Sequence, residues 1–76
     1  MAELTKKLSE LVEEELKILE SFSQGNQVYY REVEKAQDVL ELAINQMRFY
    51  MIPVDEVYDR YLSLKVKCRE IYEGEN

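Results

Sequence analysis

Residues 28–51 read VYYREVEKAQDVLELAINQMRFYM, and this stretch decides the fold. Its apolar residues recur at steps of three and four, which is the spacing of one face of an α-helix. The stripe consists of Tyr29, Val33, Ala36, Leu40, Ala43, Met47 and Tyr50, and further apolar residues widen it on both sides. A helix that is apolar over so much of its circumference packs against more than one neighbour, so we expect it to be the central element.

The flanking segments carry the same helical spacing. Residues 2–23 form a leucine-rich stripe, and the five residues 23–27 (SQGNQ) then break the pattern. Gly25 can adopt the left-handed conformation that ends a helix, and Asn26 is a favourable N-cap for the next. Proline is tolerated in the first turn of a helix, so we expect a third helix to restart at Pro53. The sequence therefore predicts one domain, residues 1–76, with helices at about 2–23, 28–51 and 53–72 and a frayed tail at 73–76.

Three helices of similar length favour an all-α fold, an antiparallel three-helix bundle. One pattern supports an alternative. The seven-residue frame of the second segment continues through Pro53 without slipping, in Val33, Leu40, Met47, Val54, Tyr61 and Cys68. A helical hairpin with a long second helix kinked at Pro53 would also show this frame. In both cases the excess of apolar surface on a chain this small predicts a homodimer.

Composition excludes several classes of protein. The 76 residues include only two glycines and one proline, too few turn signals for a β-sandwich or barrel. The net charge of −6 makes nucleic acid an unfavourable partner. With one cysteine the chain forms no internal disulfide, so we expect a cytoplasmic protein. No apolar run is long enough to span a bilayer, so no membrane association is expected.

The residues that usually carry catalysis are scarce. Histidine is absent, and Gly25 and Gly74 are too far apart to form a phosphate-binding loop. Cys68 occupies a stripe position, where a small core residue is expected and not a nucleophile. We therefore predict no catalytic residue, no cofactor and no metal site, and a protein that is not an enzyme. The alternative is a small magnesium-dependent enzyme that uses carboxylates three residues apart, at Glu10/Glu13, Glu56/Asp59 or Glu70/Glu73.

Glu15 breaks the apolar pattern of the first helix. Its helical neighbours are Leu11, Val12, Ile18 and Leu19, so it points towards the apolar stripe. A carboxylate in that position needs a partner, and we predict an ion pair that sets register or oligomeric state. Lys65 is the expected partner and Arg48 the second choice, since each is flanked by apolar stripe residues. The alternatives for Glu15 are a catalytic or ligand-binding carboxylate and a position at the edge of the stripe that reaches water.

Aromatic and apolar residues supply the candidate interaction surface. Tyrosine combines an apolar ring with a polar tip, which suits interfaces that are partly open to water. The candidate interface residues are Tyr29, Tyr30, Leu42, Phe49, Tyr50, Tyr58 and Tyr61. The tyrosines also suit packing in the core and at its edge, and that interpretation is favoured over a binding surface. The leading hypothesis is a non-enzymatic adaptor, regulator or inhibitor with a protein partner. A helical dimer that gathers Arg60, Lys65, Lys67 and Arg69 against nucleic acid is a further alternative.

Overall fold

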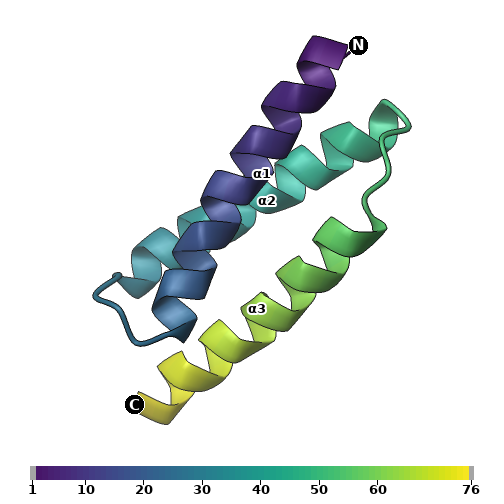
Figure 1. Cartoon of the computed structure of the whole chain (residues 1–76). Helices are drawn as coiled ribbons and strands as arrows, with labels where there is room; N and C mark the ends of the chain where they lie inside the picture. The colour runs from purple at the N-terminus through teal and green to yellow at the C-terminus, as the bar shows by residue number, and fades with distance from the viewer. Residues whose placement is uncertain (1, 76) are drawn as a thin grey trace.

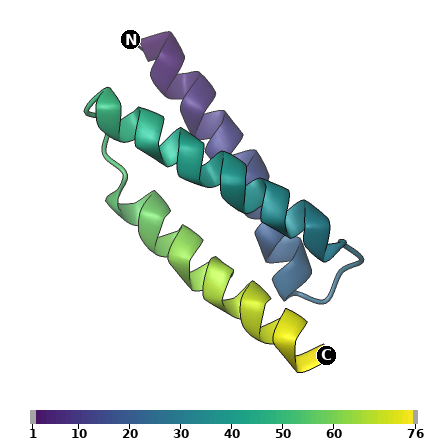
Figure 2. The same ribbon diagram turned by 180° about the vertical axis from the view of Figure 1, so that it is seen from behind.

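The fold consists of three helices packed together. The structure, a computed structural model, describes residues 2–75 and the side chains of residues 2–74. It contains α1 (Ala2–Ser23), α2 (Tyr30–Phe49) and α3 (Asp55–Glu75), with no strand among residues 2–75. The predicted all-helical fold is confirmed to this extent. Figures 1 and 2 show the chain reversing direction at both connections, so the start of α1 lies at the same end as the α2–α3 connection.

The first connection closes α1 with a glycine in the left-handed conformation. Gly25 has φ 85°, its N–H donates to the Phe22 carbonyl at 3.2 Å, and the Asn26 N–H donates to the Ser21 carbonyl at 3.0 Å. This pair of bonds is a Schellman motif, which satisfies carbonyls that the end of a helix leaves free. Asn26 closes α1 and lies too far from the start of the next helix to cap it. Instead α2 begins at Tyr30, two residues later than predicted, with Tyr29 as its N-cap.

The second connection repeats the same motif around Met51. The Met51 N–H donates to the Arg48 carbonyl at 3.0 Å, and the Ile52 N–H donates to the Met47 carbonyl at 2.8 Å. Pro53 follows, outside both helices, and α3 starts at Asp55. The predicted restart at Pro53 was therefore two residues early. No helix runs through Pro53, so the alternative of one long kinked helix is wrong for this structure.

The predicted frayed tail at 73–76 is helical as far as Glu75, and residue 76 lies outside the described residues. Glycine at position 74 is tolerated in the last turn of α3, where little packing depends on it. Among residues 2–75 no helix has the length and apolar character required to cross a bilayer.

The core lies along the axis of the bundle and draws on all three helices. Its buried apolar residues are Val12, Leu16, Leu19, Phe22, Val33, Ala36, Leu40, Ala43, Ile44, Met47, Val54, Tyr61 and Cys68. Most of these are predicted stripe positions, and Cys68 is a core residue as predicted. Tyr29 and Tyr50 belong to the predicted stripe but are exposed, whereas Ile44 beside the stripe is buried. However, α1 makes the most extensive contacts with the other two helices, and α2 and α3 contact each other least. The prediction that residues 28–51 form the central helix is therefore wrong.

Candidate interaction surface

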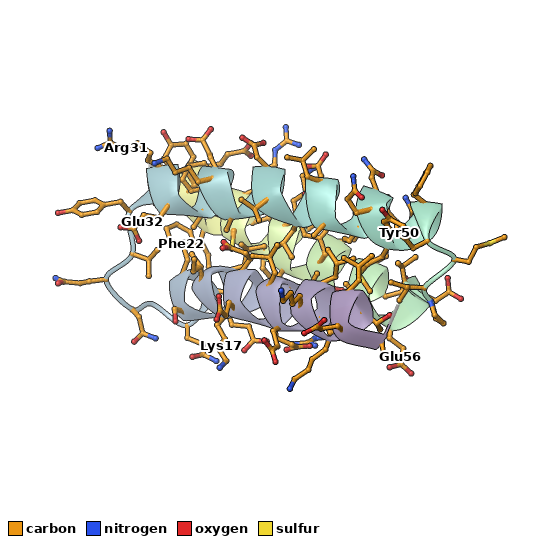
Figure 3. The ribbon with its side chains drawn as sticks, turned by 90° about the horizontal axis from the view of Figure 1, so that it is seen from above. Lys17, Phe22, Arg31, Glu32, Tyr50 and Glu56 are labelled. Carbon is orange, nitrogen blue, oxygen red and sulfur yellow. The ribbon has the colours of Figure 1, made fainter. Side chains whose placement is uncertain are left out.

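The feature that stands out on the surface is the connection between α2 and α3. Phe49 is 78% exposed, Met51 is 90% exposed, and Tyr50 between them is 36% exposed. The Phe49 and Tyr50 rings contact edge to face, with centroids 5.1 Å apart. We call these three residues the apolar turn. Figure 3 shows Tyr50 at the same end of the bundle as Glu56, with Phe22 and Arg31 towards the other end.

The backbone of the apolar turn is ordered but strained. Met51 has φ 62° and is the only residue other than glycine with a positive φ among those described. In a residue with a Cβ atom this conformation costs about 1–2 kcal/mol, which is why glycine usually occupies it. Gly25 fills the same place at the end of α1 without that cost. The chain thus maintains a strained methionine whose side chain reaches into solvent.

Leu42 extends the exposed apolar surface along α2. It is 68% exposed and lies seven residues, two helical turns, before Phe49 on the same face. The positions between them on that face are the uncharged Asn45 and Gln46. This face is exposed because α3 packs mainly on α1 and leaves the outer side of α2 uncovered.

A shallow groove between α2 and α3 contains the polar contacts that join these two helices. The groove measures about 150 Å³ and is lined by Glu41, Ile44, Asn45, Arg48, Tyr58, Tyr61, Leu62 and Lys65. The Tyr61 hydroxyl donates to the Glu41 carboxylate at 2.6 Å, and Lys65 Nζ lies 3.7 Å from the same carboxylate. Cations cover both rings, Lys65 over Tyr61 and Arg48 over Tyr58. The walls of the groove are therefore charged groups and aromatic rings that already contact one another.

Tyr61 belongs to the core and not to the surface, which corrects its assignment to the interface. It is 1% exposed, so a partner cannot reach its ring. Burial, and then the hydrogen bond to Glu41, raise the pKa of the Tyr61 phenol above its ordinary range. The phenol is thus a neutral donor that joins α3 to α2. Sequence reasoning missed Glu41, whose only signal was its place beside the buried Leu40 and three residues before Ile44.

The remaining predicted interface residues divide into two groups. Tyr29 is well exposed, as are Leu42 and Phe49. Tyr30 is half-buried instead, because it stacks on Tyr72 with centroids 3.8 Å apart and meets the Phe22 ring edge to face. Tyr58 is half-buried beneath the Arg48 guanidinium, whose Cζ atom lies 4.8 Å from the centroid of the Tyr58 ring. These two tyrosines therefore join α2 to α3 through their rings.

Glu15 is half-buried and not paired as predicted. Lys65 lies beside Glu41, and Arg48 lies over Tyr58, so neither of the proposed partners meets Glu15 within the described part of the chain. The physical reason is the direction of the buried face of α1. That face is centred on Val12, Leu16 and Leu19, whereas the neighbours of Glu15 on its other side, Leu11 and Ile18, are only partly buried.

The carboxylates proposed for magnesium do not converge. Among residues 2–74 no group of three or more histidine, cysteine or acidic side chains is arranged to hold a metal ion. Glu13 instead accepts a hydrogen bond from Arg60 at 2.7 Å, and Glu20 lies 3.2 Å from the same guanidinium. The hydrogen bond to Glu13 is the main cause that raises the pKa of Arg60. This exposed network links α3 to α1 and contributes little to stability, because water screens it.

The basic residues of α3 are mostly beside acids. Arg60 pairs with Glu13 and Glu20, Lys65 lies near Glu41, and Arg69 pairs with Glu73 four residues later at 3.0 Å. A nucleic-acid phosphate would have to displace these carboxylates. The structure does not gather these cations on an open basic face.

Met51 is the surface residue that sequence reasoning missed. The sequence does contain a sign of this turn. Proline is common shortly after the left-handed residue that ends a helix, and Pro53 lies two residues after Met51. The turn was not predicted because methionine rarely adopts a positive φ.

In comparisons with known protein families, with curated proteins and with solved structures, no match to this chain was found.

Proposed function

We propose that this chain is a small interaction protein without enzymatic activity, an adaptor, regulator or inhibitor that acts through protein–protein contacts. In this proposal it works in the cytoplasm as a pair of antiparallel three-helix bundles. The single observation that carries the proposal is the exposure of the apolar turn together with its ordered backbone. Large apolar residues that are held in place yet excluded from the core are typical of contact surfaces.

Charge and packing support a protein as the partner. The net charge is −6, and the basic side chains that could meet a phosphate backbone are mostly beside carboxylates. The groove between α2 and α3 has a volume of only about 150 Å³, and the charged side chains that line it already contact one another or the tyrosine rings. The magnesium-dependent enzyme and the nucleic-acid-binding dimer stay predictions that no observation here favours.

An affinity capture experiment tests the proposal. The chain is immobilised through its C-terminus, and retained proteins are compared for the wild type, Phe49→Ser and the control Val66→Ser. Val66 is also exposed and apolar but lies on α3, away from the apolar turn. We expect Val66→Ser to retain the same proteins as the wild type and Phe49→Ser to lose them, with both variants fully helical by circular dichroism. Equal retention by all three chains would contradict the proposal.

A further inference from the structure

We propose that the apolar turn binds the apolar turn of a second copy of this chain, with the Met51 side chain as the anchor of the contact. The inference rests on the proposed function, which makes this patch an interaction surface, and it names the partner. It begins from a comparison within one molecule. Two helices end in the same Schellman motif, one on Gly25 and the other on Met51.

The comparison shows that folding alone does not require methionine at position 51. Glycine at position 25 closes the motif without strain, and glycine would serve equally at position 51. Methionine there does not repay the strain by packing, because 90% of its surface is exposed. Residues in strained conformations cluster where they contact ligands or partners. The side chain of Met51 is therefore placed for a contact outside its own chain.

The apolar turn is also ready for that contact. The hydrogen bonds from Met51 and Ile52 to the end of α2 fix the backbone, and Ile52 packs against the core. The Phe49 ring is held edge to face by Tyr50. The apolar turn would therefore lose little conformational freedom on binding a partner. A smaller loss of conformational freedom gives a higher affinity.

The size of the patch matches a weak symmetric dimer. Side chains of this size present roughly 150–250 Å² each when fully exposed. With their observed exposures, the apolar turn and Leu42 offer about 500 Å² per chain, hence about 1,000 Å² across a twofold axis. That total reaches the lower limit for a specific interface, so the dimer should be weak and reversible. A stable obligate dimer would need about twice this area.

Charge at the edges of the patch favours the same arrangement. Arg48 precedes the apolar turn, and Asp55 and Glu56 follow it at the exposed start of α3. A twofold axis through the patch can bring Arg48 of one copy towards these acids of the other. In contrast, insertion of the turn into the groove of another copy would meet charged walls in a volume of about 150 Å³. Such head-to-tail contacts would also continue into open chains and not close into a pair.

Sedimentation equilibrium of the full chain tests the inference, from about 10 µM to about 1 mM, a range that brackets weak association. We expect the wild type and Val66→Ser to form a reversible dimer. Met51→Gly and Met51→Asn should fold at least as well, since both residues accept a positive φ. Their dimer dissociation constant should rise about tenfold or more, because each substitution removes the anchor twice from a symmetric pair.

Salt concentration provides a second readout. The ion pairs at the edges of the patch are exposed and contribute little, so the main effect of added salt should be to screen the repulsion between two acidic chains and strengthen the dimer. A dimer that weakened strongly with salt would be held by ion pairs and would overturn the role given to Met51. A wild type that stays monomeric throughout, a Met51 variant that dimerises normally, or masses that grow beyond the dimer would each overturn the inference. If the wild type is monomeric while capture of other proteins still depends on Phe49, the inference fails together with the pairing of two bundles, and the proposed role as an interaction protein stands. If neither association depends on the apolar turn, both fail.

Discussion

Replacement of Tyr61 by phenylalanine tests how α2 and α3 are held together. The ring fills the core, and its hydroxyl donates to Glu41 at 2.6 Å. A hydrogen bond to a charged acceptor contributes about 1.5–3 kcal/mol. The Glu41 side chain is 54% exposed, so water competes for it, and phenylalanine avoids the desolvation of the hydroxyl. We therefore expect Tyr61→Phe to cost about 1 kcal/mol, which is below that range.

The assay is urea unfolding followed by circular dichroism at neutral pH. A loss of about 1 kcal/mol corresponds to a melting temperature lower by about 4–8 °C for a domain of this size. Tyr61→Ala removes the ring as well and should cost about 3–5 kcal/mol. Glu41→Gln serves as the matched control, since it keeps an acceptor but removes the charge. If Tyr61→Phe cost nothing while Glu41→Gln were destabilising, the phenol would not be the group that Glu41 stabilises.

The pH dependence of the same pair checks the sign of the effect. The pKa of Tyr61 is raised in the folded chain, first by burial and then by Glu41. Its contribution to stability is therefore complete below the unfolded pKa of about 10 and is lost as the pH rises above that value. The stability difference between wild type and Tyr61→Phe should be constant from about pH 7 to 9 and shrink above about pH 10. A difference that stayed constant into strongly alkaline solution would refute this account.

Three further outcomes are expected. Leu40→Ala, in the core, should cost about 2–5 kcal/mol in urea unfolding, whereas Leu42→Ala on the exposed face of the same helix should stay within about 0.5 kcal/mol. Gly25→Ala should cost about 1–2 kcal/mol because alanine resists φ 85°, and Gly25→Asn should cost less; equal losses would argue against strain as the cause. Burial raises the pKa of Cys68, so its thiol should react with a disulfide reagent at pH 8 only as fast as the chain unfolds, and a fast reaction in the folded protein would contradict its burial.

The core could be predicted from the sequence because residues spaced three and four apart point to the same face of a helix. Val12, Leu16 and Leu19 on α1 and Leu40 on α2 lie in the apolar stripes, and all are buried. The ends of α2 were less predictable. The helix runs from Tyr30 to Phe49 and is shorter than the apolar stripe suggests. The residues before and after it belong to the two connections, where the Schellman motifs and Pro53 set the backbone conformation.

The candidate surface was only partly predictable, since it depends on how the helices pack together. Tyr50 and Tyr61 are the same residue type and both lie in the predicted apolar pattern, yet only Tyr61 is buried, because α3 turns it towards α1 and α2. Glu15 points close to the apolar stripe by helical geometry alone, but the buried face of α1 is centred to one side of it. Leu42 and Phe49 were correctly singled out as excess apolar residues, and their exposure follows from the side of α2 that α3 leaves uncovered.

An odd number of alternating helices sends the two chain ends in opposite directions. The bundle is 43 Å long and at most 18 Å across, with the start of α1 at one end and the end of α3 at the other (Figure 1). The apolar turn shares the end where α1 begins. A fluorescent protein or purification tag fused before α1 would crowd that turn, whereas one fused after α3 would stand a full bundle length away and leave it accessible.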